Sequence, residues 1–315
     1  MYTRLNKRIF LFLLLVVVMF ACVAEDLSNC MQSASLKFKY VLNPTGENLF
    51  GVSIDKVRVF IFNAEGKYIA ERSDSSIQFT NDYQMPIALE EGNYSFVAVC
   101  GKEINFSIGQ YSSTEDLNQF SPDLVVGETT LDDFRIKINT LNGNLFPENI
   151  GTLFVANQTN ISFPRLKDEP IVFDLINDRN TIDLEISGLT DLRYIPVLTS
   201  RNGRYNYENN IPADAKDNIY MPSQDKGQNQ FQFNVMRLLT NTPLSLRLID
   251  ERGKNVLPGF KSINLIQEIL KSPEFSSQLD LDKNSDYTIK LKFDGTTLVS
   301  ISINSWENIQ VKPEA

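Results

Sequence analysis

Short runs of alternating apolar and polar residues, or of β-branched and aromatic residues, recur along the chain from residue 36 onward. Such runs are typical of β-strands. Polar turns separate them and carry the residues that tight hairpins require, as in "AEGK", "RNGR", "DERGK" and "FDGT". The predicted strands form a first series at 36–42, 57–63, 94–100, 134–139 and 152–156, and a second at 171–176, 181–187, 194–200, 231–239, 244–250, 287–293 and 297–303.

Two series of this kind predict an all-β fold with two β-sandwich domains in tandem. A polar segment at 157–170 separates them and contains Pro164 and Pro170. We therefore expect one domain over 35–160 and the other over 165–315. Helix is expected only in short pieces, at 113–120, where the residues suit a helix N-terminus, and at 261–271, where apolar residues recur at helical spacing.

The first residues have the pattern of a targeting segment. Arg4, Lys7 and Arg8 precede an apolar run of 12 residues, Ile9–Phe20. A helix of that length is too short for a hydrocarbon core of about 30 Å. We therefore expect residues 1–21 to be a signal peptide that is removed.

Cys22 follows Ala21 directly and resembles the lipidated cysteine of a bacterial lipoprotein signal, although Met19 and Phe20 depart from the usual pattern. The alternative is an ordinary secretory signal with a cysteine nearby. Several acyl chains on Cys22 would give a stable membrane tether, with 22–34 as its linker, because each buried methylene contributes about 0.8 kcal/mol. Loss of the three positive charges of the signal takes the net charge from −9 to −12.

Two further cysteines, Cys30 and Cys100, remain for an oxidising compartment. A bond between them would close a 71-residue loop and stabilise the chain by about 4 kcal/mol in the chain-entropy model. The alternative is a buried thiol at Cys100 beside an exposed Cys30. The sequence does not separate the two.

Composition excludes several classes of function. The chain has 30 Lys and Arg against 39 Asp and Glu, spread along its length, which opposes binding of nucleic-acid phosphates. It has no histidine, so Ser-His-Asp and Cys-His catalytic sites and histidine-ligated metals are excluded. No motif for catalysis or for a cofactor is present, and we predict a protein that is not an enzyme.

Two segments have residues that could form a binding site. Asp280, Asp282, Asn284 and Asp286 alternate as in a calcium loop, but Ser285 and Leu291 stand where such a loop needs Gly and Glu. A polar turn is the simpler interpretation, and we predict no metal site.

The segment "NGRYNYENN" at 202–210 could stack Tyr205 and Tyr207 against a sugar. The alternative is an Asn-Gly hairpin whose tyrosines pack along a sheet.

Several segments together resemble the FimB and Mfa-type family of fimbrial anchor lipoproteins from Gram-negative anaerobes. "CVAEDLSNC" resembles the lipidated cysteine, acidic linker and second cysteine of that family. "FGVSIDKVRVFIFNAEGKYI" and "MPIALEEGNYSFVAVCG" are similar to its first strands. Its later segments are matched in order by "DLINDRNTIDLEISGL", "NGRYNYENN", "IYMPS", "FNVMRLL", "LDLDKNSDYTIKLKF" and "ISINSWENIQV".

The resemblance implies two transthyretin-like domains and a structural subunit that is lipid-tethered at the outer membrane. The acidic pair of this chain, Glu25 and Asp26, resembles the signal that exports some lipoproteins to the cell surface. The protein would anchor the fimbrial shaft at its base and limit its length. Its partners would be stalk subunits, joined by β-strand exchange. The alternatives are a minor tip adhesin, with a processed N-terminus, and a glycan-binding surface lipoprotein.

Stalk subunits of this kind open their groove by losing an N-terminal strand, but here that cut would release the lipid. We therefore expect this chain to keep its first strand and to donate its C-terminal portion, 297–311. In that segment Val299, Ile301, Ile303, Ile309 and Val311 share one parity. The alternative is that 297–303 is the last core strand and 304–315 a frayed tail.

Overall fold

The protein is described by a computed structural model that covers residues 32–309 except 76–77, 103–104, 115–116, 164–168, 190–191, 214, 228 and 258. No helix in these ranges is long and apolar enough to cross a membrane. The expected signal peptide, Cys22, Cys30 and Val311 lie outside the described residues.

The centre of the N-terminal half is a five-stranded sheet in the order β11-β9-β5-β2-β3. Its inner strands β2 and β5 carry consecutive apolar residues, most clearly "FVAV" within β5, because side chains on both faces are buried there. The strands are β2 (Val57–Phe62), β3 (Tyr68–Asp74), β5 (Gly92–Lys102), β9 (Thr152–Phe163) and β11 (Ile176–Asn177).

A three-stranded sheet in the order β10-β1-β4 covers one face of this central sheet. It contains β1 (Gln32–Lys39), β4 (Gln84–Leu89) and β10 (Ile171–Asp174). The core between the two sheets is rich in aromatic rings, and the Phe38 ring stacks 5.7 Å from that of Phe50 and 5.4 Å from that of Phe173. The short helix α2 (Phe50–Ser53) supplies Phe50.

A second sheet, in the order β14-β8-β6-β7, covers the other face. Phe134 of this sheet packs 5.2 Å from Phe60 of the central sheet, measured between ring centroids. The strands are β6 (Phe106–Thr114), β7 (Leu117–Ser121), β8 (Phe134–Ile138) and β14 (Arg204–Tyr205). The N-terminal half therefore has three layers.

The C-terminal half is a sandwich of a six-stranded sheet, β16-β17-β12-β20-β21-β22, and a four-stranded sheet, β15-β13-β18-β19. Its helices are α3 (Leu265–Ile269) and α4 (Gln278–Lys283). Its strands are β12 (Arg179–Ser187), β13 (Ile195–Ser200), β15 (Asn218–Tyr220), β16 (Gln224–Gly227), β17 (Gln230–Met236), β18 (Ser245–Ile249), β19 (Ile263–Asn264), β20 (Asp286–Asp294), β21 (Thr297–Ile303) and β22 (Trp306–Ile309).

The predicted all-β class with short helices is confirmed, and each of the twelve predicted strands coincides with one or more strands of the structure. The helix predicted at 261–271 is present as the shorter α3. The helix predicted at 113–120 is wrong. Thr114 pairs with Leu117 and Tyr111 with Phe120, so the described residues of this segment belong to the paired strands β6 and β7, and their ladder outweighs the local helix-start signal.

The division between the halves differs from the expected boundary. Strand β10 pairs in parallel with β1, and β11 pairs with β9, so the N-terminal sheets extend to Asn177, past residue 165. Strand β14, from still later in the chain, pairs with β8.

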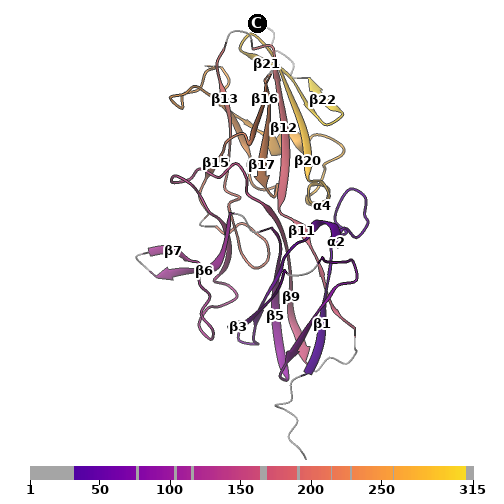
Figure 1. Cartoon of the computed structure of the whole chain (residues 1–315). Helices are drawn as coiled ribbons and strands as arrows, with labels where there is room; N and C mark the ends of the chain where they lie inside the picture. Colours follow the sequence, from indigo (N-terminus) through magenta and orange to yellow (C-terminus); the bar gives the residue numbers. More distant parts are fainter. Residues whose placement is uncertain are drawn as a thin grey trace, which may run out of the picture.

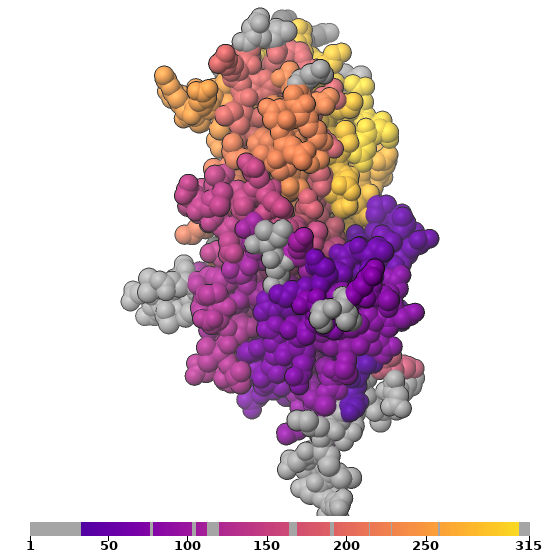
Figure 2. All heavy atoms as spheres, in the orientation of Figure 1, coloured from indigo at the N-terminus to yellow at the C-terminus, as the bar shows by residue number. Residues whose placement is uncertain are grey.

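The two halves lie end to end in an elongated molecule (Figure 1). Strand β1 begins at the lower tip, and β22 lies on the outer flank of the upper half. In the space-filling view the last part of the chain, coloured yellow, forms the upper right flank (Figure 2).

Candidate functional site

The hairpin β21–β22 ends the six-stranded sheet. Strand β21 pairs with β20 on one side and with β22 on the other, whereas β22 has β21 as its only partner among the described strands. An edge strand presents a row of backbone N–H and C=O groups to any extended segment that approaches. The edge of β22 is therefore a candidate site for strand addition.

The turn of this hairpin determines which backbone groups face outward. Asn304 and Ser305 form a two-residue loop between the paired residues Ile303 and Trp306, and the φ angle of Asn304 is 50°. Residues that flank such a loop exchange both backbone hydrogen bonds, and the next pair along the ladder exchanges none. The N–H and C=O of Glu307 consequently point away from β21.

Two side-chain hydrogen bonds hold β22 in place. Asn308 donates from Nδ2 to Oε2 of Glu268 at 3.3 Å, and the Ser305 hydroxyl donates to Oε1 of Glu274 at 3.0 Å. Trp306 pairs with Ile303 and packs against the core while remaining partly exposed. The edge is thus ordered before a partner arrives.

The structure separates the residues of the expected donor stripe. Ile301 and Ile303 are fully buried and pair with Leu291 and Ile289, so 297–303 is a core strand, which confirms the first part of the alternative. The second part, a frayed tail from residue 304, is wrong for Trp306–Ile309, which form β22. Val299 lies at a bulge in that ladder, and Ile309 pairs with Ser300. After the tight turn at Asn304, the even-numbered residues of β22 lie on the same face of the sheet as Ile301 and Ile303, so Ile309 lies on the other face. Sequence spacing alone did not show this change.

The opposite edge of the same sheet is built differently. Strand β16 is short and fully exposed, and its ladder with β17 is irregular between Asp225 and Gly227. Lys226 forms an ion pair with Asp183 at 2.6 Å. Bulges and charges of this kind protect an edge from pairing, so β22 is the more accessible of the two.

Strand β1 has the opposite character to β22. It is the middle strand of its sheet, paired in parallel with β10 and antiparallel with β4. Leu36 and Phe38 of β1 have no exposed surface. Removal of β1 would break two ladders and open a groove in the aromatic core.

Cys100 is 2% exposed, and its backbone pairs with that of Phe154, whose ring contacts Tyr40 at 4.9 Å. Gln32 lies eight positions before Tyr40, roughly 26 Å along an extended strand. Cys30 is two residues further back and reaches at most about 7 Å from Gln32. A bond between Cys30 and Cys100 stays a prediction, and the placement of β1 disfavours it, because bonded cysteines need Cα atoms within about 7 Å.

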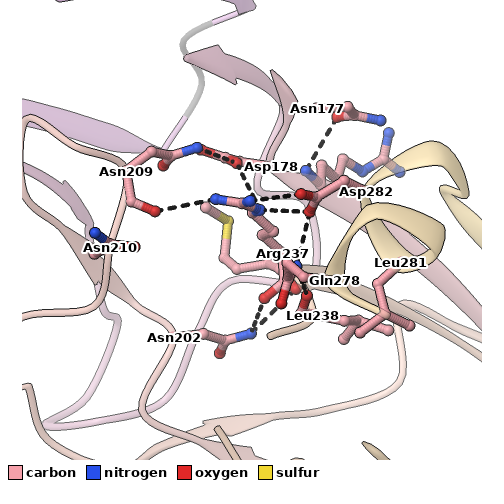
Figure 3. A network of polar contacts seen from close by, with 12 residues as sticks. Asn177, Asp178, Asn202, Asn209, Asn210, Arg237, Leu238, Gln278, Leu281 and Asp282 are labelled. Atoms are coloured by element: carbon pink, nitrogen blue, oxygen red, sulfur yellow. Dashed lines mark hydrogen bonds and ion pairs between the residues drawn. The ribbon is translucent and has the colours of Figure 1, made fainter. Parts of the chain in front are cut away.

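A buried polar network joins the two halves (Figure 3). Asp178 lies between β11 and β12, and its N–H donates to the carbonyl of Leu153 in the N-terminal half at 2.8 Å. Its carbonyl accepts from the N–H of Arg237 at 2.7 Å. The Arg237 guanidinium donates to both carboxylate oxygens of Asp282 at 2.7 Å and to the carbonyl of Asn209 at 3.1 Å.

The Asp178 carboxyl is an uncommon group at this joint. Burial, opposed by the nearby Arg237 and the hydrogen bond from Asn209, raises the pKa of Asp178 to about 7. Within the described part of the chain, no donor reaches Oδ2 of Asp178 or Oδ1 of Asn209. A proton on Asp178 would supply a donor in this acceptor-rich corner, which fits the raised pKa.

Two aspartates of the segment that resembles a calcium loop have structural roles, and one of them belongs to this network. Asp280 caps helix α4 in a capping box with Ser277, and Asp282 pairs with Arg237. No group of three or more metal-binding side chains occurs in the ranges that the structure covers. The network was missed from sequence because Asp178, Arg237 and Asp282 are far apart in the chain and adjacent only after folding.

The two tyrosines of the segment 202–210 differ in burial. Tyr205 is fully buried in β14, so it packs along a sheet and is unable to stack against a sugar. Tyr207 is partly exposed at the edge of the core.

Comparison with protein families gives one match over most of the chain. The family of "Fimbrillin-A associated anchor proteins Mfa1 and Mfa2" matches residues 27–312. Comparison with curated proteins gave no match.

Solved structures share the fold. The fimbrial anchor protein Mfa2 from Porphyromonas gingivalis is 18% identical, with a TM-score of 0.71 over 90% of this chain and 100% of that one. A DUF1812 protein from Bacteroides thetaiotaomicron, described as a candidate polysaccharide-binding protein, is 23% identical, with a TM-score of 0.75 over 89% and 99%. A candidate adhesin from Bacteroides ovatus is 19% identical, with a TM-score of 0.71 over 93% and 98%.

Proposed function

This chain belongs to the family of fimbrillin-A associated anchor proteins, and from that premise we propose that it is the lipid-tethered foot of a fimbrium at the outer membrane. Its role is structural and not catalytic. The N-terminal end is attached to the membrane through Cys22, and the C-terminal half contacts the shaft.

The observation that carries this proposal is the contrast between the two ends of the molecule. Gln32, ten residues after Cys22, starts β1 at the lower tip, while the open edge of β22 lies on the upper half (Figure 1). A tether at one end and an edge for strand addition at the other suit a subunit placed between a membrane and a filament.

The position of β1 supports the expectation that this strand is kept. Leu36 and Phe38 fill the core between two sheets, and the strand pairs on both sides. A retained β1 leaves no groove for a further subunit to fill. The fibre would therefore end at this subunit, which gives the proposed limit on fibre length a physical basis.

The joint supports the mechanical part of the proposal. One hydrophobic cluster runs from Phe134 and Leu153 in the N-terminal half to Ile289 in the C-terminal half. The ion pair of Arg237 and Asp282 adds to it. The two halves are joined by packed and hydrogen-bonded contacts and not by a flexible linker. A force on the shaft would therefore be transmitted through the protein to the tether.

Mass spectrometry of the mature N-terminus, combined with a Cys22→Ala variant, tests this function. We expect an acylated Cys22 in the native protein, and with the variant we expect fimbriae to be shed into the medium. An N-terminus that is cut beyond β1 would instead identify a tip subunit. Fimbriae that stay on cells carrying the Cys22→Ala variant would contradict the anchoring role.

A further inference from the structure

The ladder between β5 and β9 is interrupted at one place. Tyr94 pairs with Ile161 and Phe96 with Gln158, so Ser95 faces two residues, Thr159 and Asn160. Asn160 has a φ angle of 57°, in the left-handed region that residues with a side chain seldom adopt. Bulges re-aim side chains and occur often beside binding sites, so a bulge with a left-handed residue is a reason to look for one.

The re-aimed side chains line a depression of about 320 Å³. Ser95, Thr159 and Asn160 line it from the bulge, and Asn63 and Asn93 line it from the turn after β2 and the start of β5. The Asn63 side-chain oxygen accepts from the N–H groups of Glu65 and Lys67, and that of Asn93 accepts from the Ser162 hydroxyl. Their oxygens are engaged, so both residues can offer a ligand the N–H donors of their amides.

An aromatic ring from a segment later in the chain completes the depression. Tyr207 follows β14, packs partly buried against the core, and lines the same depression as Leu131. Its hydroxyl lies 3.3 Å from Oε1 of Glu208. The depression thus has one aromatic ring together with several amide and hydroxyl groups.

We propose that this depression binds a neutral saccharide. Sugar hydroxyls both donate and accept hydrogen bonds, which suits amides and hydroxyls, and the C–H face of a sugar ring packs on an aromatic ring. The described lining residues include one carboxylate, Glu65, and neither Lys nor Arg, so an anionic sugar finds no charge partner there. A protein partner would need several apolar anchors, and the depression offers few.

The structure provides matched variants for a test. Asn160→Gly removes the amide and keeps the φ angle, which glycine adopts easily. Asn229→Gly is its control, because Asn229 has a φ angle of 62° and does not line the depression. Tyr207→Ala removes the ring, and Tyr194→Ala removes another partly buried ring from the same core, away from the depression.

The full mature protein and the four variants are titrated with lactose, N-acetyllactosamine, maltotriose and mannotriose, with sialyllactose and a heparin hexasaccharide as anionic probes. Thermal unfolding of each variant checks the fold. We expect at least one neutral probe to bind, with affinity at least ten-fold weaker for Tyr207→Ala and Asn160→Gly and changed less than two-fold for the two controls.

The proposal is overturned if no neutral probe binds at millimolar concentration, if only the anionic probes bind, or if the two depression variants bind as the unaltered protein does. Each of these outcomes leaves the anchoring role untouched, because that role depends on Cys22, β1 and β22.

Discussion

The first and last described strands of this chain differ in nearly every physical respect. Strand β1 is central in its sheet and fills the core with Leu36 and Phe38. Strand β22 is at an edge, has one partner among the described strands and leaves Glu307 exposed. The strand near the expected lipid is therefore costly to remove, and the strand at the far end is available for pairing. In the proposed anchor, the first strand stays in place near the membrane, and the last strand binds the shaft.

The largest effect is expected from Phe38→Ala in β1. The ring is fully buried and stacks on Phe50 and Phe173, so its loss leaves a cavity and should lower the free energy of unfolding by about 3–5 kcal/mol. Urea unfolding measures this, with Val52→Ala as the control, because Val52 is 84% exposed in α2 and should change stability by less than about 0.5 kcal/mol. A loss below about 1 kcal/mol would contradict the role of the Phe38 ring in the core.

An effect of comparable size, spread over several pH units, is expected at the joint between the halves. The pKa of Asp178 is raised from 3.8 to about 7 by burial, so the folded protein binds a proton there more tightly than the unfolded chain. The contribution of Asp178 to stability is then complete below about pH 4 and is lost as the pH rises to about 7, with a slope of up to about 1.4 kcal/mol per pH unit. Asp178→Asn has no such proton to lose.

Unfolding free energies of the unaltered protein and of Asp178→Asn, measured from pH 4 to pH 8, test this sign. The difference between them should shift in favour of the variant as the pH rises through that window. Glu274→Gln, at an exposed carboxyl of the same half, serves as the control. A difference that stays constant with pH would contradict a titrating carboxyl in the joint.

An effect on binding and not on folding is expected at the open edge. Glu307→Pro removes the outward N–H of β22 and leaves the ladder with β21 intact, because proline is tolerated on the solvent side of an edge strand. We expect roughly ten-fold weaker attachment of the shaft, read as fimbriae recovered from the medium, while Glu307→Ala, which keeps the N–H, behaves as the unaltered protein. If cells with either variant retain fimbriae equally well, β22 does not contact the shaft.

The smallest effect is expected from a reducing agent. The distance along β1 disfavours a bond between Cys30 and Cys100, so reduction should leave the urea midpoint of the mature protein unchanged. A bond that closes this loop would instead contribute about 4 kcal/mol, and its reduction would lower the midpoint clearly.

Local pattern predicted the elements of this fold better than it predicted their assembly. Strand β20 alternates buried and exposed residues from Asp286 to Asp294, so periodicity alone identifies it. The prediction for 113–120 was wrong because its helix-start residues are a local signal, whereas the pairing of β6 with β7 decides the structure there. Which strands share a sheet, as with β1 and β10, depends on contacts between distant residues and has no local signal.

The candidate sites show the same limit. The core role of 297–303 was available from its apolar alternation, and it is confirmed. The edge of β22 could not be predicted from the sequence. The two-residue turn at Asn304 determines which residues of β22 face the core, and the sequence pattern did not reveal that turn. The pairing of Arg237 with Asp282 likewise joins residues whose proximity is created by folding.

Hydrogen–deuterium exchange of the mature protein, alone and mixed with purified stalk subunits, tests the contrast between the two strands most directly. The amides of β1 should exchange slowly in both samples, because that strand is paired on both sides and stays in place. The Glu307 amide of β22 should exchange quickly in the protein alone and become protected when the stalk subunit binds. Protection that appears at β10 and β4 with release of β1, and no change at β22, would contradict the account.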